Sequence, residues 1–453
     1  MPMDSVELRV AKKIAEEVND AGGRTFFVGG YVRDTLMQKN GKDIDLEVHG
    51  ITPRQLENIL DSAGERIEIG KSFGVYNLKG CTLDIAMPRR ETLIGSGHRD
   101  FAVAVDPFIG TEKAAKRRDF TINALMQDVL TGEIIDHYGG IRDLENGIIR
   151  HVSDESFAED PLRVLRGAQF AARFGFEVAS ETKELCRGMD LTTLSCERVF
   201  EELRKALLKA EKPSVFFEVL RSMNRLSVWF SEVQQLEGIN QSKQHHPEGD
   251  VWNHTMQVLN EAAKRRKNVK NPMGFMLAAL VHDFGKIVCT REINGEIHAY
   301  MHETEGLPIV SKFMHRLTNE KALINYVLNL TELHMKPSIM VADNSSVKAT
   351  NRMFDMAVEP VDLIQLSLAD NPMSERNGNE EFLMNRLALF EEYMDRPYVM
   401  GKDLIASGIA PGKYFSSLIE YAHKLRLAGV PKESALKQTL GFAKEKFGIY
   451  TKR

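Results

Sequence analysis

The stretch from Thr25 to Glu47, TFFVGGYVRDTLMQKNGKDIDLE, constrains this chain more than any other part of the sequence. An apolar run ends at Gly29-Gly30, and the composition of Tyr31 to Met37 indicates a short helix directly after it. Glycine leaves no side chain in the way of a phosphate, and the N–H groups at a helix start favour an anion. The turn is therefore a candidate phosphate-binding site.

A predicted strand at Asp43 to Val48 follows this helix. Because side chains alternate along a strand, we expect Asp43, Asp45 and Glu47 on one face and the apolar residues between them on the other. Paired carboxylates suit Mg²⁺ held together with the phosphates of a nucleotide, and a solvated acidic face is the alternative. Asp84, on another predicted strand, is a candidate third carboxylate or else a plain exposed strand residue.

Length and composition set wider limits. The 453 residues suggest about three domains, and 43% hydrophobic with 27% charged residues is typical of a globular protein. The net charge of −5 gives no global signal for nucleic acid, so any such contact must come from local basic patches. From about residue 150 onward strand signals nearly vanish and helical periodicity dominates, which predicts a domain boundary there.

The four cysteines are scattered, without the spacing of a disulfide framework or a zinc knuckle. This pattern is typical of a reducing compartment and predicts a cytoplasmic protein. The longest apolar run, around Met273 to Val281, is too short to span a bilayer, so no membrane partner is expected.

Two later motifs complement the glycine turn. In the first, RRDFTINAL at residues 117–125, Arg118 is a candidate to clamp a triphosphate or a ribose, with a solvated basic face as the alternative. In the second, EDPLRVLR, the residues Asp160, Arg163 and Arg166 are three apart and share one face of a predicted helix. An Asp before Pro also has the composition of a helix N-cap, and this structural alternative stays open.

The carboxylate and guanidinium of this helix can read a base. Cytosine and adenine both present an amino donor beside a ring-nitrogen acceptor, whereas uracil and guanine present a carbonyl beside an N–H. Asp160 accepting from the amino group and Arg163 donating to the ring nitrogen would admit C and A and refuse U and G. Side chains can in this way select nucleotides without a nucleic-acid template.

Five motifs in order, GGYVRD, DID, RRDFTINAL, EDPLRVLRGAQFAARFGF and LSCERVFEEL, resemble the bacterial class II CCA-adding tRNA nucleotidyltransferases of the poly(A) polymerase superfamily. The resemblance implies an α+β fold: a nucleotidyltransferase head of mainly antiparallel sheet with helices, an all-helical neck, a helical HD domain and a helical C-terminal segment. The expected domains are residues 1–150, 151–237, 238–395 and 396–453.

The resemblance also assigns roles, which are expectations here. The partners are the 3′ end of tRNA, CTP and ATP, with Mg²⁺ as the cofactor of the head. One departure from the family is Gln169, where a further Arg often stands one turn after Arg166. The catalytic acids are Asp43, Asp45 and Asp84, with Mg²⁺ on Asp43 and Asp45, and the nucleotide-binding residues are Gly29, Gly30, Arg33, Arg118, Asp160, Arg163 and Arg166.

A second constellation lies in the predicted helices of the third region. It resembles the HD superfamily of metal-dependent phosphohydrolases, with flanks HHPEGDVWNHT, ALVHDFGK and MHETEG like those of HD-bearing CCA-adding enzymes. Relatives have been associated with phosphatase, 2′-nucleotidase and 2′,3′-cyclic phosphodiesterase activity, and some keep the fold without evident hydrolysis. Imidazoles and carboxylates in this mixture bind a divalent metal, whose identity stays open. The expected ligands are His254, His282, Asp283, His302, His334 and Asp370.

The function expected from these features is template-independent addition of CCA to tRNA, with phosphohydrolase activity at the HD site. One alternative is a poly(A) polymerase, or an enzyme that adds only A or only C. Another makes the HD domain the main activity and the head an RNA-binding module. Two candidate tRNA contacts are the C-terminal segment and the basic run KRRKNVK at residues 264–270. The oligomeric state is left open.

Overall fold

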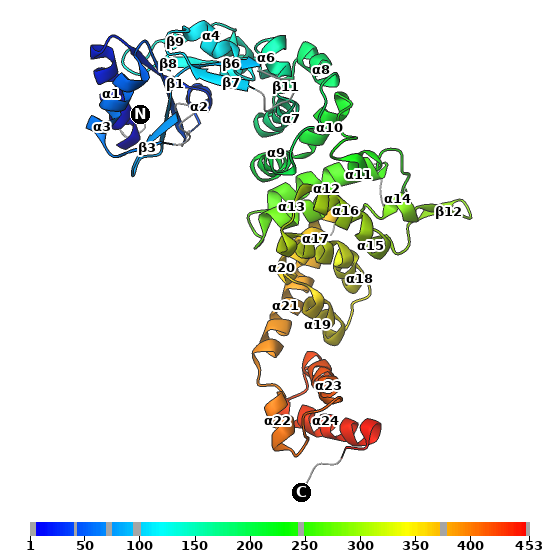
Figure 1. The fold of residues 1–453 in the computed structure, drawn as a ribbon. Helices are drawn as coiled ribbons and strands as arrows, with labels where there is room; N and C mark the ends of the chain where they lie inside the picture. Colours follow the sequence, from blue (N-terminus) through cyan, green and yellow to red (C-terminus); the bar gives the residue numbers. More distant parts are fainter. Residues whose placement is uncertain are drawn as a thin grey trace. The chain divides into compact units, whose positions relative to one another are not determined.

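The computed structural model describes residues 6–39, 43–68, 75–93, 101–242, 249–371 and 378–449, so part of the HHPEGDVWNHT flank, residues 245–248, lies outside them. The chain divides into two compact units, Met1–Ala206 with Val215–Val228, and Leu207–Ser214 with Trp229–Arg453. Figure 1 shows strands concentrated toward the N-terminus and helices over the rest of the chain. The expected four-domain division stays a prediction.

A seven-stranded sheet with the order β3-β4-β5-β2-β1-β8-β9 forms the core of the first unit. Every neighbouring pair is antiparallel except β2 and β5, which are parallel. The predicted mainly antiparallel sheet is therefore confirmed. Its strands are β1 (Arg24–Val28), β2 (Ile44–His49), β3 (Arg66–Glu68), β4 (Val75–Leu78), β5 (Leu83–Ala86), β8 (Met126–Asp128) and β9 (Ile134–Ile135).

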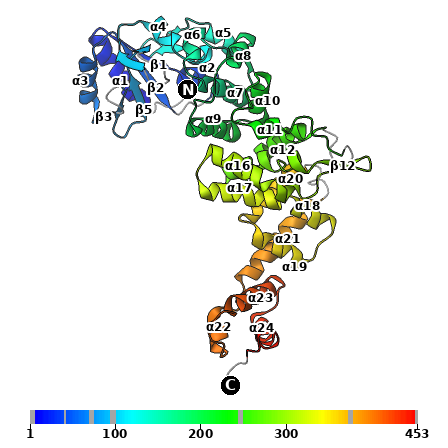
Figure 2. The ribbon, with the colours of Figure 1, turned by 45° about the vertical axis from the view of Figure 1, so that its right-hand side comes forward.

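Helices α1 (Val6–Asp20) and α3 (Pro53–Ala63) lie side by side against this sheet (Figure 2). Apolar residues at helical spacing on both helices pack on Leu46 and Val48 of β2 in one buried cluster. Asp45 and Glu47 alternate with these apolar residues and so point to the opposite face. The predicted alternation along this strand is confirmed, and the helices leave the acidic face open.

Short elements connect this sheet to the helix predicted to read a base. That helix, α7 (Leu162–Phe174), ends at Gly175, which adopts a left-handed φ of 72° that a glycine takes at low cost. The other elements of this part are α2 (Gly30–Leu36), β6 (Arg89–Leu93), β7 (Phe101–Val105), α4 (Thr111–Lys116), η1 (Thr121–Asn123), α5 (Gly140–Glu145), β10 (Ile148–Ile149), α6 (Asp154–Ala158), β11 (Glu177–Val178), α8 (Ser180–Arg187), α9 (Cys196–Lys209) and α10 (Ser214–Ser222).

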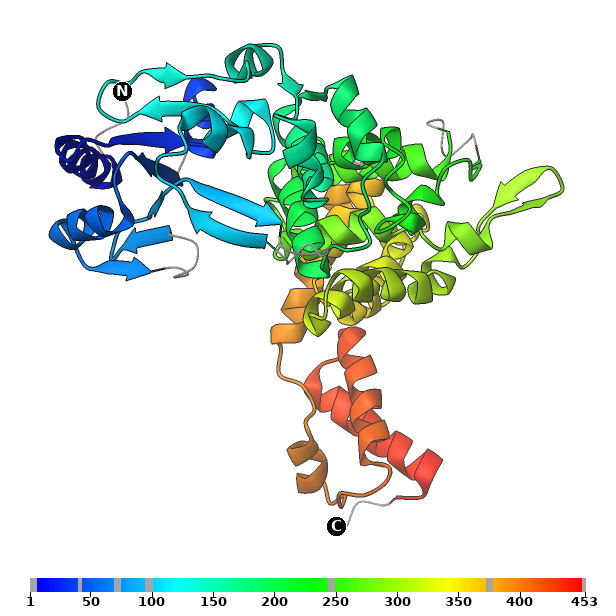
Figure 3. The same ribbon diagram turned by 45° about the horizontal axis from the view of Figure 1, so that its top comes forward.

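The second unit is helical apart from the paired strands β12 (Arg291–Ile293) and β13 (Glu296–His298), which project from the helices in Figure 3. Separate buried clusters lie around Phe354 and Leu363 and around Leu404 and Leu418. The helices are α11 (Ser231–Gln234), α12 (Val251–Arg265), α13 (Pro272–Val281), α14 (Lys286–Cys289), α15 (His302–Glu305), α16 (Leu307–Leu317), α17 (Lys321–Leu333), α18 (Met335–Ala342), α19 (Val347–Met356), α20 (Pro360–Asp370), α21 (Asn379–Asp395), α22 (Gly401–Ala406), α23 (Phe415–Leu427) and α24 (Lys432–Phe447).

One window of the described residues, Pro272–Cys289, is long and apolar enough by composition to cross a membrane. It is longer than the apolar run seen in the sequence because it includes α14 as well as α13. Since 72% of the window is buried inside the protein, it is packed as a core helix is, and it gives no evidence for a membrane.

Candidate functional site

The predicted acids of the head come together across two strands. Asp45 on β2 is the register partner of Asp84 on β5, so the parallel pairing of these strands sets the two residues side by side. Burial raises the pKa of Asp45, and the carboxylates of Asp84 and Asp43 raise it further against the opposing charge of Arg118. This cluster of negative charge is a site that a divalent cation would neutralise, and its oxygen donors fit Mg²⁺.

The glycine turn meets this cluster. Gly29 precedes α2 with φ 65° and ψ −127°, a conformation that side-chain-bearing residues rarely adopt. A side-chain carbon at position 29 would lie 3.0 Å from Arg118 Nη1 and 3.7 Å from Asp45 Oδ2. The structure therefore brings Gly29, Arg118 and Asp45 to one place, and Gly30 opens the helix beside them. A cavity of about 350 Å³ lies here, lined by Asp45, Asp84 and Arg118 among others.

Arg118 is held by a residue whose role is not predicted from the sequence. Its Nη2 donates to Glu47 Oε2 at 3.2 Å, and the other oxygen of Glu47 lies 2.9 Å from His49 Nε2. Burial alone raises the pKa of Glu47, but the hydrogen bond with His49 and the charge of Arg118 outweigh it and lower this pKa. The acidic face of β2 thus ends in an ion pair that orients Arg118 of the motif RRDFTINAL.

Arg33 lies inside the protein, with only 4% of the residue exposed. Its Nε donates to Asp34 Oδ1 at 2.9 Å, and its Nη1 donates to Asn123 Oδ1 at 2.5 Å. The guanidinium also lies 4.6 Å from the ring centre of Phe174 on α7. Arg33 therefore links the glycine turn to the base-reading helix, and its predicted contact with a triphosphate stays a prediction.

A chain of hydrogen bonds continues this link to Arg166. Arg166 Nε donates to Asp119 Oδ2 at 2.8 Å, and Asn123 Nδ2 donates to Asp119 Oδ1 at 3.0 Å. Burial raises the pKa of Asp119, but Arg166 and Asn123 outweigh this effect and lower it. Asp119 and Asn123 have no predicted role, although both belong to the motif RRDFTINAL.

The remaining members of the predicted base-reading face have partners of their own. Asp160 Oδ1 accepts a hydrogen bond from the Leu162 N–H at 3.1 Å, as a helix cap does, and its Oδ2 accepts from Arg198 Nη2 on α9 at 2.8 Å. Arg163 donates to the carbonyls of Ser156 and Arg117 at 2.6 and 2.8 Å. The Asp160 carboxylate is thus fixed beside the first turn of α7, whose capping residue is Pro161, and reading of a base by Asp160 and Arg163 stays a prediction.

Gln169, the departure from the family pattern, faces the interior of the first unit. It is 1% exposed, and its Nε2 has no hydrogen-bond partner among the described residues. The side chain is therefore part of the packed interior of the first unit.

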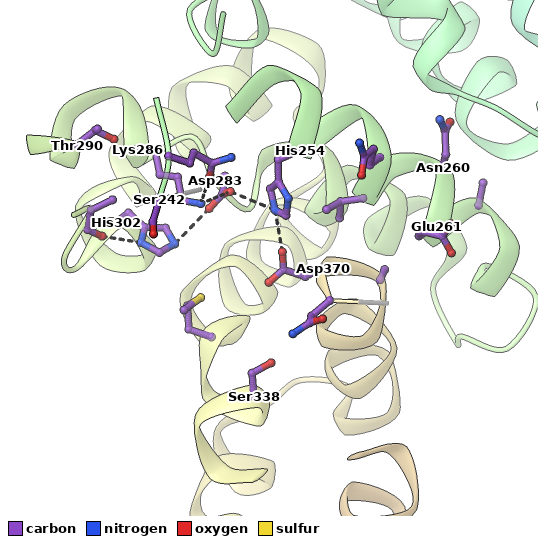
Figure 4. Close-up of a pocket in the computed structure, with 18 of the residues that line it drawn as sticks. Ser242, His254, Asn260, Glu261, Asp283, Lys286, Thr290, His302, Ser338 and Asp370 are labelled. Atoms are coloured by element: carbon purple, nitrogen blue, oxygen red, sulfur yellow. Dashed lines mark hydrogen bonds and ion pairs between the residues drawn. The ribbon is translucent and has the colours of Figure 1, made fainter. Parts of the chain in front are cut away.

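The histidines and aspartates of the second constellation gather in the second unit, although they come from five helices and the turns after them. Figure 4 shows four of them, His254, Asp283, His302 and Asp370. They form two groups, in each of which the ligand atoms lie within 4.8 Å of one another. His254, His282 and Asp370 form the first group, and Asp283, His302 and His334 form the second. Asp283 lies between them, with Oδ2 at 3.3 Å from His282 Nε2 and Oδ1 at 3.2 Å from His302 Nε2.

Backbone carbonyls orient three of these imidazoles. The Nδ1 of His282, His302 and His334 lies 2.9, 2.8 and 2.6 Å from the carbonyls of Ala279, Ala299 and Thr331. An Nδ1–H that donates to a carbonyl leaves the lone pair of Nε2 for a metal, which is the usual support of a metal-bound histidine. All three Nε2 atoms face the centre of the cluster, so this donor set fits a divalent metal.

The electrostatics of the cluster favour bound positive charge. Burial raises the pKa of Asp283, but Lys286 and His282 outweigh it and hold this pKa well below its usual range. Burial lowers the pKa of His282, and the two aspartates outweigh it and raise the value to about 10. Lys286 Nζ lies 2.7 Å from Asp283 Oδ2 and donates to Gln241 Oε1 at 2.6 Å.

Comparison with known proteins places these sites in a family. Residues 25–150 match the model of the Poly A polymerase head domain. A curated protein of Actinobacillus pleuropneumoniae serotype 5b, named a Multifunctional CCA protein, is 39% identical over 316 residues, which cover 68% of this chain and 74% of the relative. This chain belongs to the family of CCA-adding enzymes. A CCA protein of the same name from Pasteurella multocida is likewise 39% identical, over 69% of this chain and 74% of the relative.

Solved structures of CCA-adding enzymes share the fold along nearly the whole chain. The Bacillus stearothermophilus enzyme in complex with CTP aligns with a TM-score of 0.69 and 19% identity, covering 97% of this chain and 98% of that one. The Thermotoga maritima enzyme complexed with tRNA aligns with a TM-score of 0.63 and 20% identity, covering 96% and 94%. The α+β fold of the CCA-adding family is therefore confirmed.

The buried carboxylate of Asp119 predicts how acid acts on the first unit. Because its pKa in the folded protein lies below the usual value, the unfolded chain binds more protons in acid. The stability that this group contributes is present above the unfolded pKa and is lost as pH falls through the folded pKa. We expect the urea midpoint of wild type to fall between pH 5 and pH 3, and that of Asp119→Asn to fall less.

The measurement is urea denaturation of the full chain followed by brief proteolysis, with peptides of the first unit quantified by mass spectrometry. Glu445→Gln removes one exposed charge from α24 of the other unit and is the control for a change in net charge. If the urea midpoint falls with pH by the same amount in wild type and in Asp119→Asn, a group other than Asp119 is responsible for the acid dependence.

Proposed function

We propose that Asp43 and Asp45, with Asp84 beside them, hold Mg²⁺ in the reaction of this chain, which is addition of CCA to the 3′ end of tRNA from CTP and ATP. The observation that carries the proposal is the meeting of Gly29, Arg118 and the carboxylates at one open face of the sheet. When bound there, Mg²⁺ supplies activation of the tRNA 3′-hydroxyl and charge neutralisation for the departing pyrophosphate.

The residues of the chain position the nucleotide. The Gly29-Gly30 turn leaves room for the triphosphate, and Arg118, held by Glu47, places a guanidinium beside it. The 3′-hydroxyl oxygen attacks the α-phosphorus, and the bond to the β,γ-pyrophosphate breaks as the proton leaves the hydroxyl. Positioning and charge neutralisation carry most of this catalysis.

Asp160 and Arg163 select the base in this proposal. Arg198 and the cap bond fix the Asp160 carboxylate, while its side chain stays 35% exposed and open to a ligand. The family membership favours CCA addition over synthesis of poly(A) and over addition of C or A alone.

The first test removes the acid pair. Asp43→Ala/Asp45→Ala should lower nucleotide addition to a tRNA transcript that lacks CCA by about 10³-fold or more, because loss of metal ligands removes several kcal/mol of transition-state stabilisation. Addition is measured with each nucleotide alone and with CTP and ATP together, on transcripts ending before CCA and in CC. Glu16→Ala, an exposed acid of α1, should keep wild-type activity. Normal addition by a folded double variant would refute the assignment.

The second test addresses base selection. Asp160→Ala should raise incorporation of UTP and GTP relative to CTP and ATP by about 10- to 100-fold, since a hydrogen bond to a charged group contributes about 1.5–3 kcal/mol. Glu159→Ala changes the neighbouring exposed acid and should keep wild-type fidelity. Unchanged misincorporation in Asp160→Ala would leave this carboxylate with its capping role alone.

A second function, metal-dependent phosphohydrolysis, is favoured by the two groups, because Asp283 of the second group also lies 3.3 Å from His282 of the first. A pair of metals held there would supply a hydroxide near neutral pH and charge neutralisation. In the overall reaction a water oxygen adds to phosphorus, the ester P–O bond breaks, and the alcohol leaves with a proton. The buried ammonium of Lys286 lies beside Asp283, where it can accompany a bound phosphate.

The third test counts metals in the Asp43→Ala/Asp45→Ala background, which removes the head site. After dialysis against Mn²⁺, this protein should retain about two ions, and a further Asp283→Asn change should lose both because the carboxylate lies between the groups. Asp370→Asn should lose the ion of the first group alone, and Asp343→Asn, an exposed residue, should lose none. Atomic emission gives the count. Equal metal content in Asp283→Asn and its parent would exclude a shared ligand.

A further inference from the structure

The cavity that contains the histidine cluster is much larger than the cluster. Its volume is about 1380 Å³, above the roughly 300–1,000 Å³ of ordinary small-molecule pockets. Figure 4 shows His254 near the middle, Thr290 and His302 to one side, and Asn260 and Glu261 to the other. We name the lining on the side of Thr290 and His302 the hairpin arm and the lining on the side of Asn260 and Glu261 the α12 arm, with His254 between them.

The hairpin arm carries a flat aromatic surface. His298 of β13 and Tyr300 stack with ring centres 5.0 Å apart and an angle of 12° between their planes. Both rings line the cavity, and Tyr300 comes two residues before the candidate ligand His302. Tyr300 is 69% exposed, so its ring buries little surface within the fold. The exposed ring of Tyr300, stacked on the partly buried ring of His298, is a surface on which a nucleobase can stack.

The α12 arm carries excess positive charge. Four cations line it, Lys212, Lys264, Arg266 and Lys267, against two acids, Glu211 and Glu261, which leaves two positive charges in excess. Lys264 lies ten residues after His254 on α12, or about 15 Å at a rise of about 1.5 Å per residue. A phosphodiester backbone leaving the cluster along α12 would meet this charge.

Some residues of the basic run KRRKNVK bond within the fold, and some line the cavity. Arg265 is buried and donates to Glu261, Arg266 donates to the carbonyls of Leu207 and Ala210, and Lys270 pairs with Glu359 at 2.9 Å. Lys264, which pairs with Glu261, and Lys267 remain exposed and line the pocket. Most of the run therefore supports the fold, and the part that can meet a ligand faces this cavity.

We propose that this pocket binds a single-stranded RNA segment of two or more nucleotides, with its terminal phosphate at the histidine cluster. A base stacks on Tyr300 and His298 in the hairpin arm, and the backbone follows the cations of the α12 arm. The inference rests on the proposed phosphohydrolase function and names the substrate class of that site. A mononucleotide or a simple phosphate ester would leave the α12 arm without a ligand.

Hydrolysis by the full chain with Mn²⁺ tests the proposal on three substrates: 4-nitrophenyl phosphate, a 3′-phosphorylated mononucleotide and a 3′-phosphorylated pentanucleotide. The KM of the pentanucleotide should be about tenfold lower than that of the mononucleotide. Lys264→Ala/Lys267→Ala should raise the KM of the pentanucleotide alone. Tyr300→Ala should raise the KM of both nucleotides, and Tyr300→Phe should restore it. Lys270→Ala, outside the cavity, is the matched control and should change none of the three.

A second measurement does not depend on turnover. A pentanucleotide containing 4-thiouridine is photocrosslinked to the full chain, and the attached peptides are identified by mass spectrometry. Beyond peptides of the head, we expect crosslinks in the segment 291–300 and in the segment 257–267.

The outcomes separate the inference from the function on which it rests. If wild type hydrolyses none of the three substrates but crosslinks form at both segments, the hydrolase function is refuted and the RNA pocket is supported. If the mononucleotide and the pentanucleotide are hydrolysed with equal KM, the RNA pocket is refuted while the hydrolase function stands. The same holds if Tyr300→Ala leaves the KM of both nucleotides unchanged. Absence of crosslinks from both segments would also overturn the RNA pocket.

Discussion

The alternation of side chains along β2 is the constraint on which the head depends. Leu46 and Val48 are buried against α1 and α3, and this burial fixes which way Asp45 and Glu47 must face. A slip of one residue would exchange the two sets, burying carboxylates and exposing the core. The six residues of β2 therefore contribute both to the hydrophobic core and to the candidate site. A substitution that changes the packing of this strand will also move its carboxylates.

Local features of this fold were predictable from the sequence because they depend on local periodicity. The predicted strand at Asp43 to Val48 and the predicted short helix at Tyr31 to Met37 agree with β2 and α2 within a residue. The pairing of Asp45 with Asp84 was not predictable in this way, because it depends on the parallel register of two strands that are far apart in the chain. A sequence pattern can identify a candidate acid, but the strand register determines which other acid lies next to it.

The same distinction explains the residues without a predicted role. Glu47 was visible on the acidic face, but its partner Arg118 lies 71 residues later. Asn123 receives the guanidinium of Arg33 from 90 residues away. The histidine cluster spans His254 to Asp370, and no periodicity joins its members, so its ligands came from resemblance to a family and not from local pattern. Contacts over such separations follow from tertiary packing, which single-residue preferences do not encode.

The hydrogen-bonded chain from Arg33 through Asn123 and Asp119 to Arg166 has a consequence for how an enzyme without a template can stay accurate. It ties the helix that we propose reads the base to the turn that we propose holds the phosphates, with a buried carboxylate in the middle. In that proposal the base and the triphosphate of one nucleotide would contact residues that are connected by this chain of hydrogen bonds. A base that does not fit would then shift the triphosphate as well. Fidelity then becomes a matter of mechanical alignment as much as of pairing, and loosening this chain of hydrogen bonds would cost accuracy before it cost binding.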